Sequence, residues 1–145
     1  MKFRFLTEEL IRHKDRKAAI ESLKEQIQTL EMEITGIKAT SYDKDIVSGG
    51  GENIREARLV ESIARLTELE NDLKVTVRNV ESVENALSGI TETERHILTE
   101  MYVDRRYGAA DRLMDEFRVE SSQLYRMKDK ALIHYGIRKY GQIQL

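Results

Sequence analysis

Apolar side chains recur at steps of three and four residues in two stretches of similar length, and no other feature of this sequence restricts its fold as strongly. The first stretch runs from Thr7 to Lys38 and the second from Asn53 to Leu87. Such steps place side chains along one narrow stripe of an α-helix, as in coiled coils. The 145 residues include no proline, the commonest helix breaker. We therefore expect two long helices.

The two stripes predict that these helices pack against each other. The first stripe consists of Ile20, Leu23, Ile27, Leu30, Ile34 and Ile37. The second consists of Leu59, Ile63, Leu66, Leu73, Val77, Val80 and Leu87, with Leu69 and Val83 beside them. A strict heptad would also bring Glu70 and Glu84 into the second stripe, which indicates either a drifting register or an exposed stretch.

The segment between the two helices, residues 39–52, contains small and polar residues and a triple glycine, so we expect a flexible loop. A loop this short favours an antiparallel, coiled-coil-like hairpin. Two helices bury little surface by themselves, and we therefore expect self-association, most simply as a dimer. A phosphate-binding loop is rejected, because no Lys-Ser or Lys-Thr pair follows the glycines and no strand precedes them.

The second long helix should end at Ser88-Gly89, and a shorter helix should follow it. Thr91 and Glu94 have the spacing of a capping box, in which each side chain accepts a hydrogen bond from the other residue's backbone N–H. This helix is expected to run to about Val103 and to present Ile97, Leu98, Met101 and Tyr102 to a core. Residues 104–108 then form a loop.

Two helices joined by a tight turn come next. The first, Ala109–Phe117, carries Leu113, Met114 and Phe117 on one face, and residues 118–120 form the turn. The second should run from Ser121 to about Tyr135, with Ser121 or Ser122 as its N-cap. Its inward residues are Leu124, Met127, Ala131 and Leu132. This pattern indicates a helix-turn-helix whose second helix is the recognition helix.

The outward residues of this second helix have the chemistry that DNA recognition needs. Glutamine can pair with adenine and arginine with guanine, while lysine and tyrosine bind phosphates. From residue 118 to 141 there are six Lys or Arg against two acids, about +4 in a chain of net charge −2. The alternative interpretation is that these outward residues form an ordinary solvent-exposed helix face that binds nothing. The candidate DNA-binding residues are Ser121, Ser122, Gln123, Tyr125, Arg126, Lys128 and Lys130.

After the recognition helix, Gly136 is expected to stop the helix, and residues 137–145 should form a short tail. The tail contains Arg138, Lys139 and Tyr140. These residues could reach phosphate, although disorder or packing is the favoured interpretation.

The C-terminal third resembles a known family. The runs ERHILTEMYVD, from Glu94, and RLMDEFRVESSQLYRMKDKAL, from Arg112, are similar to the C-terminal part of phage-encoded transcriptional regulators of the RinA/ArpU type. The matching positions are Met101-Tyr102, the segment from Ser122 to Arg126, and Lys130-Ala131-Leu132. Arg118 stands where that family usually has glycine. The resemblance implies a helix-turn-helix similar to sigma-factor region 4, a phage or prophage promoter as target, and contact with RNA polymerase.

Other classes of function find little support. The three histidines are isolated, no cysteine is present, and no nucleophile motif occurs, so we expect no enzyme, no metal site and no cofactor. The chain shows no signal-peptide pattern and no apolar run of membrane length, and the lack of cysteine fits a cytoplasmic protein.

Together these patterns predict an all-α protein with an oligomerising hairpin, residues 1–88, followed by a DNA-binding module, residues 89–145. The leading hypothesis is a regulator that binds double-stranded DNA. Two alternatives are a phage DNA-packaging component like a small terminase subunit, and a coiled-coil adaptor that binds no nucleic acid.

Overall fold

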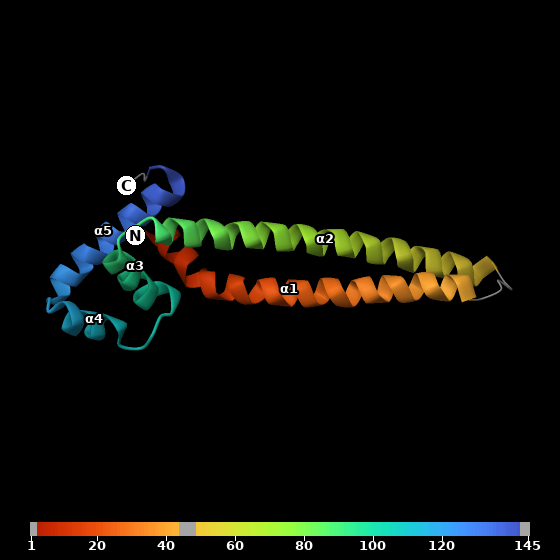
Figure 1. Cartoon of the computed structure of the whole chain (residues 1–145), viewed down its shortest axis with the longest axis horizontal. Helices are drawn as coiled ribbons and strands as arrows, with labels where there is room; N and C mark the ends of the chain where they lie inside the picture. The colour runs from red at the N-terminus through yellow and green to blue at the C-terminus, as the bar shows by residue number, and fades with distance from the viewer. Residues whose placement is uncertain (1–2, 44–48, 143–145) are drawn as a thin grey trace. The chain divides into compact units, whose positions relative to one another are not determined.

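The computed structural model describes residues 3–43 and 49–142, with the backbone alone at 40–43 and 49–52. Its elements follow the order α1 (Arg4–Asp43), α2 (Gly49–Ser88), α3 (Glu92–Leu98), η1 (Thr99–Val103), α4 (Ala109–Phe117) and α5 (Ser121–Tyr140). The element η1 is a single turn of π-helix that continues directly from α3. All regular structure in the described residues is helical, and α1 and α2 form a long antiparallel hairpin (Figure 1). The predicted all-α fold is confirmed.

Contacts divide the chain into two compact units, whereas the sequence-based division runs at residue 88. The hairpin unit is Ala18–Val77, and the terminal unit combines Met1–Lys17 with Arg78–Leu145. The ends of both long helices thus belong to the same unit as α3, α4 and α5. The helices continue without a break through residues 17 and 78.

The hairpin unit has a thin core. All six residues of the first predicted stripe are buried or half-buried. On α2, Leu69 is the most buried residue of this unit, with 3% of its surface exposed, whereas Ile63 is exposed. Leu59, Leu66, Leu69 and Leu73 follow steps of seven, three and four, so the register of α2 does not drift. The expectation that Ile63 and Glu70 belong to the stripe is wrong, because the heptad that contains Leu69 leaves both outside.

Both long helices extend beyond their predicted ends. Helix α1 begins at Arg4 rather than Thr7, and the Thr7 hydroxyl donates to the Arg4 carbonyl 3.1 Å away. At the far end, α1 continues to Asp43 and α2 starts at Gly49, so the expected loop 39–52 is shorter than predicted. Extending an existing helix adds one hydrogen bond for each residue that is fixed, which favours such extensions. The remainder of that loop, residues 44–48, lies outside the described residues.

The terminal unit has a true core. Leu10, Val83, Leu98, Leu132 and Tyr135 are almost completely buried in one cluster that joins α1, α2, α3 and α5. Glu84, also expected within the stripe, instead lies half-exposed beside it. Its carboxylate is 3.4 Å from His13 Nε2 and 3.3 Å from Lys17 Nζ. Because this core includes α5, the first turns of α1 and the last turns of α2, it fixes the candidate recognition helix within the terminal unit.

Candidate nucleic-acid interface

A second small core holds the helix-turn-helix together. Ile97 of α3, Leu113 of α4 and Leu124 of α5 are buried against one another. The partly buried residues around them are Met101, Ala110, Met114, Phe117, Val119 and Met127. One apolar residue from each helix therefore meets at the centre of a three-helix arrangement, which fixes the orientation of α5.

Helix α3 is positioned by its capping box, as predicted. The Thr91 hydroxyl accepts from the Glu94 N–H, and the Glu94 carboxylate accepts from the Thr91 N–H, both at 3.1 Å. Glu94 also contacts His134 Nδ1 on α5. Burial alone would raise the pKa of the Glu94 carboxyl, but the hydrogen bonds with Thr91 and His134 outweigh burial and lower this pKa. Glu94 therefore links the start of α3 to the middle of α5.

The turn between α4 and α5 begins at Arg118, which ends α4 with a left-handed backbone at φ 54°. This conformation explains why glycine suits the position, since a side chain there costs about 1 kcal/mol. The Val119 N–H donates to the Met114 carbonyl at 3.1 Å, and the Val119 side chain packs into the small core. The predicted boundaries of α4 and of the turn are confirmed.

The predicted N-cap of α5, Ser121 or Ser122, is wrong by one or two residues. Glu120 has the extended backbone of an N-cap, and its carbonyl accepts from the Leu124 N–H at 3.0 Å. No side chain caps this end of α5. Ser121 and Ser122 already lie within the first helical turn, so neither occupies the capping position.

Six of the seven candidate DNA-binding side chains are exposed. They are Ser121, Ser122, Gln123, Tyr125, Arg126 and Lys130. Leu124, Ala131 and Leu132 are fully buried and Met127 is half-buried, as predicted. In the part of the chain that the structure describes, Arg126 and Lys130 form no ion pair. Ser122, Arg126 and Lys130 succeed one another at steps of four, which places them along one side of the helix.

Lys128, the seventh candidate, has its charge engaged within the protein. Its side chain is 17% exposed, and its ammonium lies 2.9 Å from Asp129 Oδ1 and 5.1 Å from the centre of the Tyr125 ring. Burial alone would lower the pKa of Lys128, but the hydrogen bond to Asp129 and the nearby Tyr102 raise it. Lys128 therefore remains charged but is less available to phosphate than Arg126 or Lys130.

The C-terminal end of α5 differs from the prediction. Gly136 lies buried inside the helix, which continues to Tyr140 and ends at Gly141 with φ 81°. Glycine in a helix interior costs about 1 kcal/mol. The buried Tyr135 precedes Gly136, and Lys139, which is paired with Glu9, follows it, so tertiary contacts stabilise the helix on both sides of the glycine. Much of the expected tail is therefore the last turn of a single 20-residue helix, and residues 143–145 lie outside the described part.

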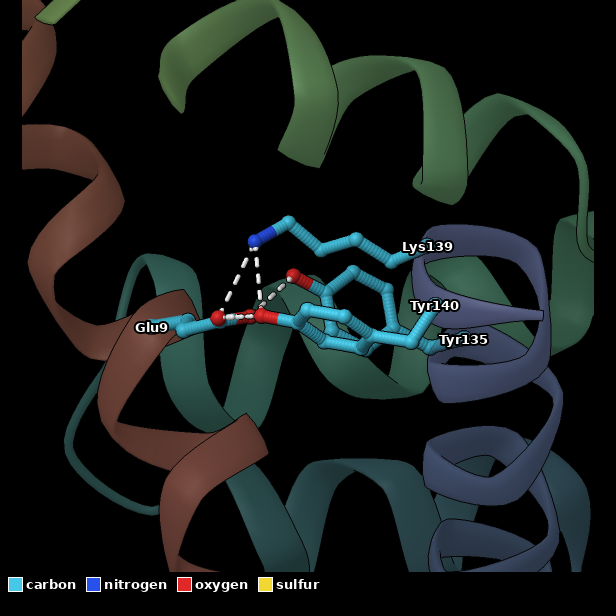
Figure 2. A network of polar contacts seen from close by, with 4 residues as sticks. All are labelled: Glu9, Tyr135, Lys139 and Tyr140. Carbon is cyan, nitrogen blue, oxygen red and sulfur yellow. Dashed lines mark hydrogen bonds and ion pairs between the residues drawn. The ribbon is translucent and has the colours of Figure 1, made fainter. Parts of the chain in front are cut away.

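Glu9 of α1 contacts three side chains from the C-terminal part of α5, namely Tyr135, Lys139 and Tyr140 (Figure 2). We call these four residues the Glu9 network. Tyr135 Oη donates to Glu9 Oε2 at 3.1 Å and Lys139 Nζ to Glu9 Oε1 at 3.0 Å. Tyr140 Oη also contacts Glu9 Oε1. Burial, followed by the charge of Glu9, raises the pKa of the Tyr135 phenol and keeps it a donor. The network binds the end of the candidate recognition helix to the start of α1, within the terminal unit.

The described residues contain no group of three His, Cys, Asp or Glu side chains that could hold a metal ion. None of the helices in residues 3–43 and 49–142 combines the length and the apolar character that a membrane crossing requires. Comparison with protein-family models, with curated proteins and with solved structures gives no match.

Sequence reasoning missed the Glu9 network and the burial of His13. Glu9 and Lys139 are 130 positions apart, and neither occurs in a recognisable motif. The one available signal was the heptad itself, because Leu6, Glu9 and His13 continue the first stripe toward the N-terminus at steps of three and four. Polar residues at stripe positions indicate that a polar partner lies opposite.

Proposed function

We propose that this protein is a DNA-binding transcriptional regulator that reads double-stranded DNA with the first turns of α5. The observation that carries this proposal is the division of α5 into two sides. Leu124, Ala131 and Leu132 are buried, while Gln123, Arg126 and Lys130 are free to contact a ligand. A rigid helix after a tight turn, with polar and basic side chains at its start, is the arrangement that enters a major groove.

In this proposal some side chains of α5 contact base edges and others contact phosphates. Arg126 and Gln123 lie three positions apart, so both can face base edges, where they offer bidentate hydrogen bonds to guanine and adenine. Lys130, one turn further along, and the hydroxyls of Ser121 and Ser122 would bind phosphates. The resemblance of the motif to RinA/ArpU-type regulators supports a phage or prophage promoter as target, with contact to RNA polymerase.

The hairpin unit would bring two such modules together. Its two helices leave Met32, Ile54, Val60 and Val75 more than half exposed, at 69%, 65%, 65% and 56%. A second copy could cover apolar surface that the hairpin alone leaves in water. A dimer would place two recognition helices on one DNA and raise the overall affinity through tethering.

Selection of bound sequences from random double-stranded DNA, with the full chain, tests the proposal. We expect enrichment of a defined sequence and an affinity that falls steeply as salt rises, because phosphate contacts release counterions. Binding without any enriched sequence would contradict base readout by α5. No binding at all, even at low salt, would favour the adaptor without nucleic acid. A ring assembly in a mass measurement would favour the DNA-packaging component.

A further inference from the structure

The loop between η1 and α4 presents three consecutive large side chains to solvent. Arg105 and Arg106 are exposed, and Tyr107 is 100% exposed. Within residues 3–43 and 49–142, neither arginine forms an ion pair or a hydrogen bond through its side chain. This Arg-Arg-Tyr segment is therefore free to bind a ligand.

The backbone of this loop is nevertheless held in place. Arg105 at φ 50° and Gly108 at φ 74° both have left-handed conformations. The Tyr107 carbonyl accepts from Arg112 Nη1 at 2.7 Å, and Arg112 Nη2 lies 3.5 Å from the mostly buried carboxylate of Glu100. The Ala109 N–H donates to the Arg106 carbonyl at 3.1 Å. A loop fixed in this way loses little conformational entropy when it binds.

The chemistry of the three side chains favours a phosphate backbone as ligand. Guanidinium groups bind phosphate with paired hydrogen bonds and lose their hydration more readily than ammonium groups. A tyrosine hydroxyl is a common donor to phosphate. A protein interface usually has an apolar centre, whereas this loop offers a single aromatic ring beside two charges. The acids nearest in sequence are Asp104, which is half-buried, and Asp111 in the first turn of α4.

We propose that Arg105, Arg106 and Tyr107 bind the sugar-phosphate backbone of double-stranded DNA beside the bases that α5 reads, an inference that rests on the proposed function. In helix-turn-helix proteins the first helix crosses the backbone while the second enters the groove. The loop precedes that first helix, α4, which has nine residues. At 1.5 Å per residue α4 is about 14 Å long, so the contacted phosphates lie up to roughly four base pairs from the turn.

The test compares three duplexes and two double variants of the full chain. One duplex carries only the selected site, and the second adds a flank of roughly ten base pairs on each side. In the third duplex the selected site is scrambled and the flanks are kept. The loop variant is Arg105→Asn with Arg106→Ala, since asparagine tolerates the left-handed backbone. The control, Arg12→Ala with Lys14→Ala, removes two exposed cations from α1 in the same unit. Thermal unfolding should be unchanged in both.

For the loop variant we expect about tenfold weaker binding to the flanked duplex that carries the selected site, and an equal loss on the third duplex. The slope of log affinity against log salt should fall by about 2, one contact for each arginine. The control should bind like the wild type. A loop variant that matches the control would overturn the inference while DNA binding stands. A changed base preference would overturn a backbone contact. If the wild type binds no DNA, the proposed function and the inference both fail.

Discussion

The two units of this chain are built from the same two long helices but differ in how much they bury. In the hairpin unit only Ile34 and Leu69 are buried among the described apolar residues, whereas the terminal unit contains two clusters of buried side chains. A heptad stripe is enough to pair two helices. A third and a fourth helix are needed to surround its residues, and α3 and α5 supply them only in the terminal unit.

The largest difference between the units is expected at their ion pairs. Glu9→Ala should lower the free energy of unfolding by about 3–5 kcal/mol, because it leaves the ammonium of Lys139, with 11% of that side chain exposed, without its partner. Glu68→Ala in the hairpin unit breaks an exposed pair with Arg65 and should cost at most about 1 kcal/mol. Urea unfolding of both variants and of the wild type measures the two losses in free energy of unfolding. Equal losses would mean that the Glu9 network is not buried as described.

A matched pair of leucines compares the cores directly. Leu124→Ala removes a fully buried side chain and should cost about 2–5 kcal/mol, since the rigid surroundings leave a cavity. Leu66→Ala removes a half-buried one from the hairpin unit and should cost about 1 kcal/mol. The same unfolding experiment applies. A larger loss at Leu66 would show that a second copy buries it in solution.

Charges in the hairpin stripe should separate assembly from folding. Ile27→Asp together with Leu30→Asp should weaken the hairpin by about 2 kcal/mol and abolish self-association, because charged groups resist burial in an apolar stripe. The terminal unit should keep its helices. Sedimentation of the variant and the wild type at tens of micromolar, with circular dichroism, measures both effects. A wild type that is monomeric under these conditions would exclude the dimer.

Acid should destabilise the terminal unit first, because the buried His13 belongs to it. Burial lowers the pKa of His13 below 6.5, although Glu84 opposes part of this effect. The unfolded chain therefore binds a proton below pH 6.5 that the folded chain resists. The stability from His13 is complete above this pH and is lost as pH falls. The total loss is about 1.4 kcal/mol for each pH unit by which the pKa of folded His13 lies below that of the unfolded chain. His13→Gln should flatten this dependence between pH 7 and pH 5, in urea unfolding at each pH. An unchanged dependence would assign it to other groups.

The features that the sequence predicted are the ones with local causes. The capping box, the boundaries of α4 and the inward side of α5 depend on residues within a few positions of each other. Their patterns can therefore be recognised in the amino-acid sequence. The continuation of α5 past Gly136, in contrast, involves contacts of Tyr135 and Lys139 with Glu9, at the other end of the chain. Likewise, exposure of Lys128 could not be judged without Tyr102 and Tyr125 in place. Long-range polar contacts leave no periodic signal.

The variant Arg126→Ala tests base readout by α5 without disturbing the buried side of the helix. Affinities of the wild type and this variant are measured for a selected duplex and a scrambled one at two salt concentrations, with Lys130→Ala as the phosphate-contact control. We expect Arg126→Ala to lose about 1–3 kcal/mol on the selected duplex and far less on the scrambled one, while Lys130→Ala weakens both equally. Equal losses for Arg126→Ala on both duplexes, or no loss on either, would contradict base readout by α5.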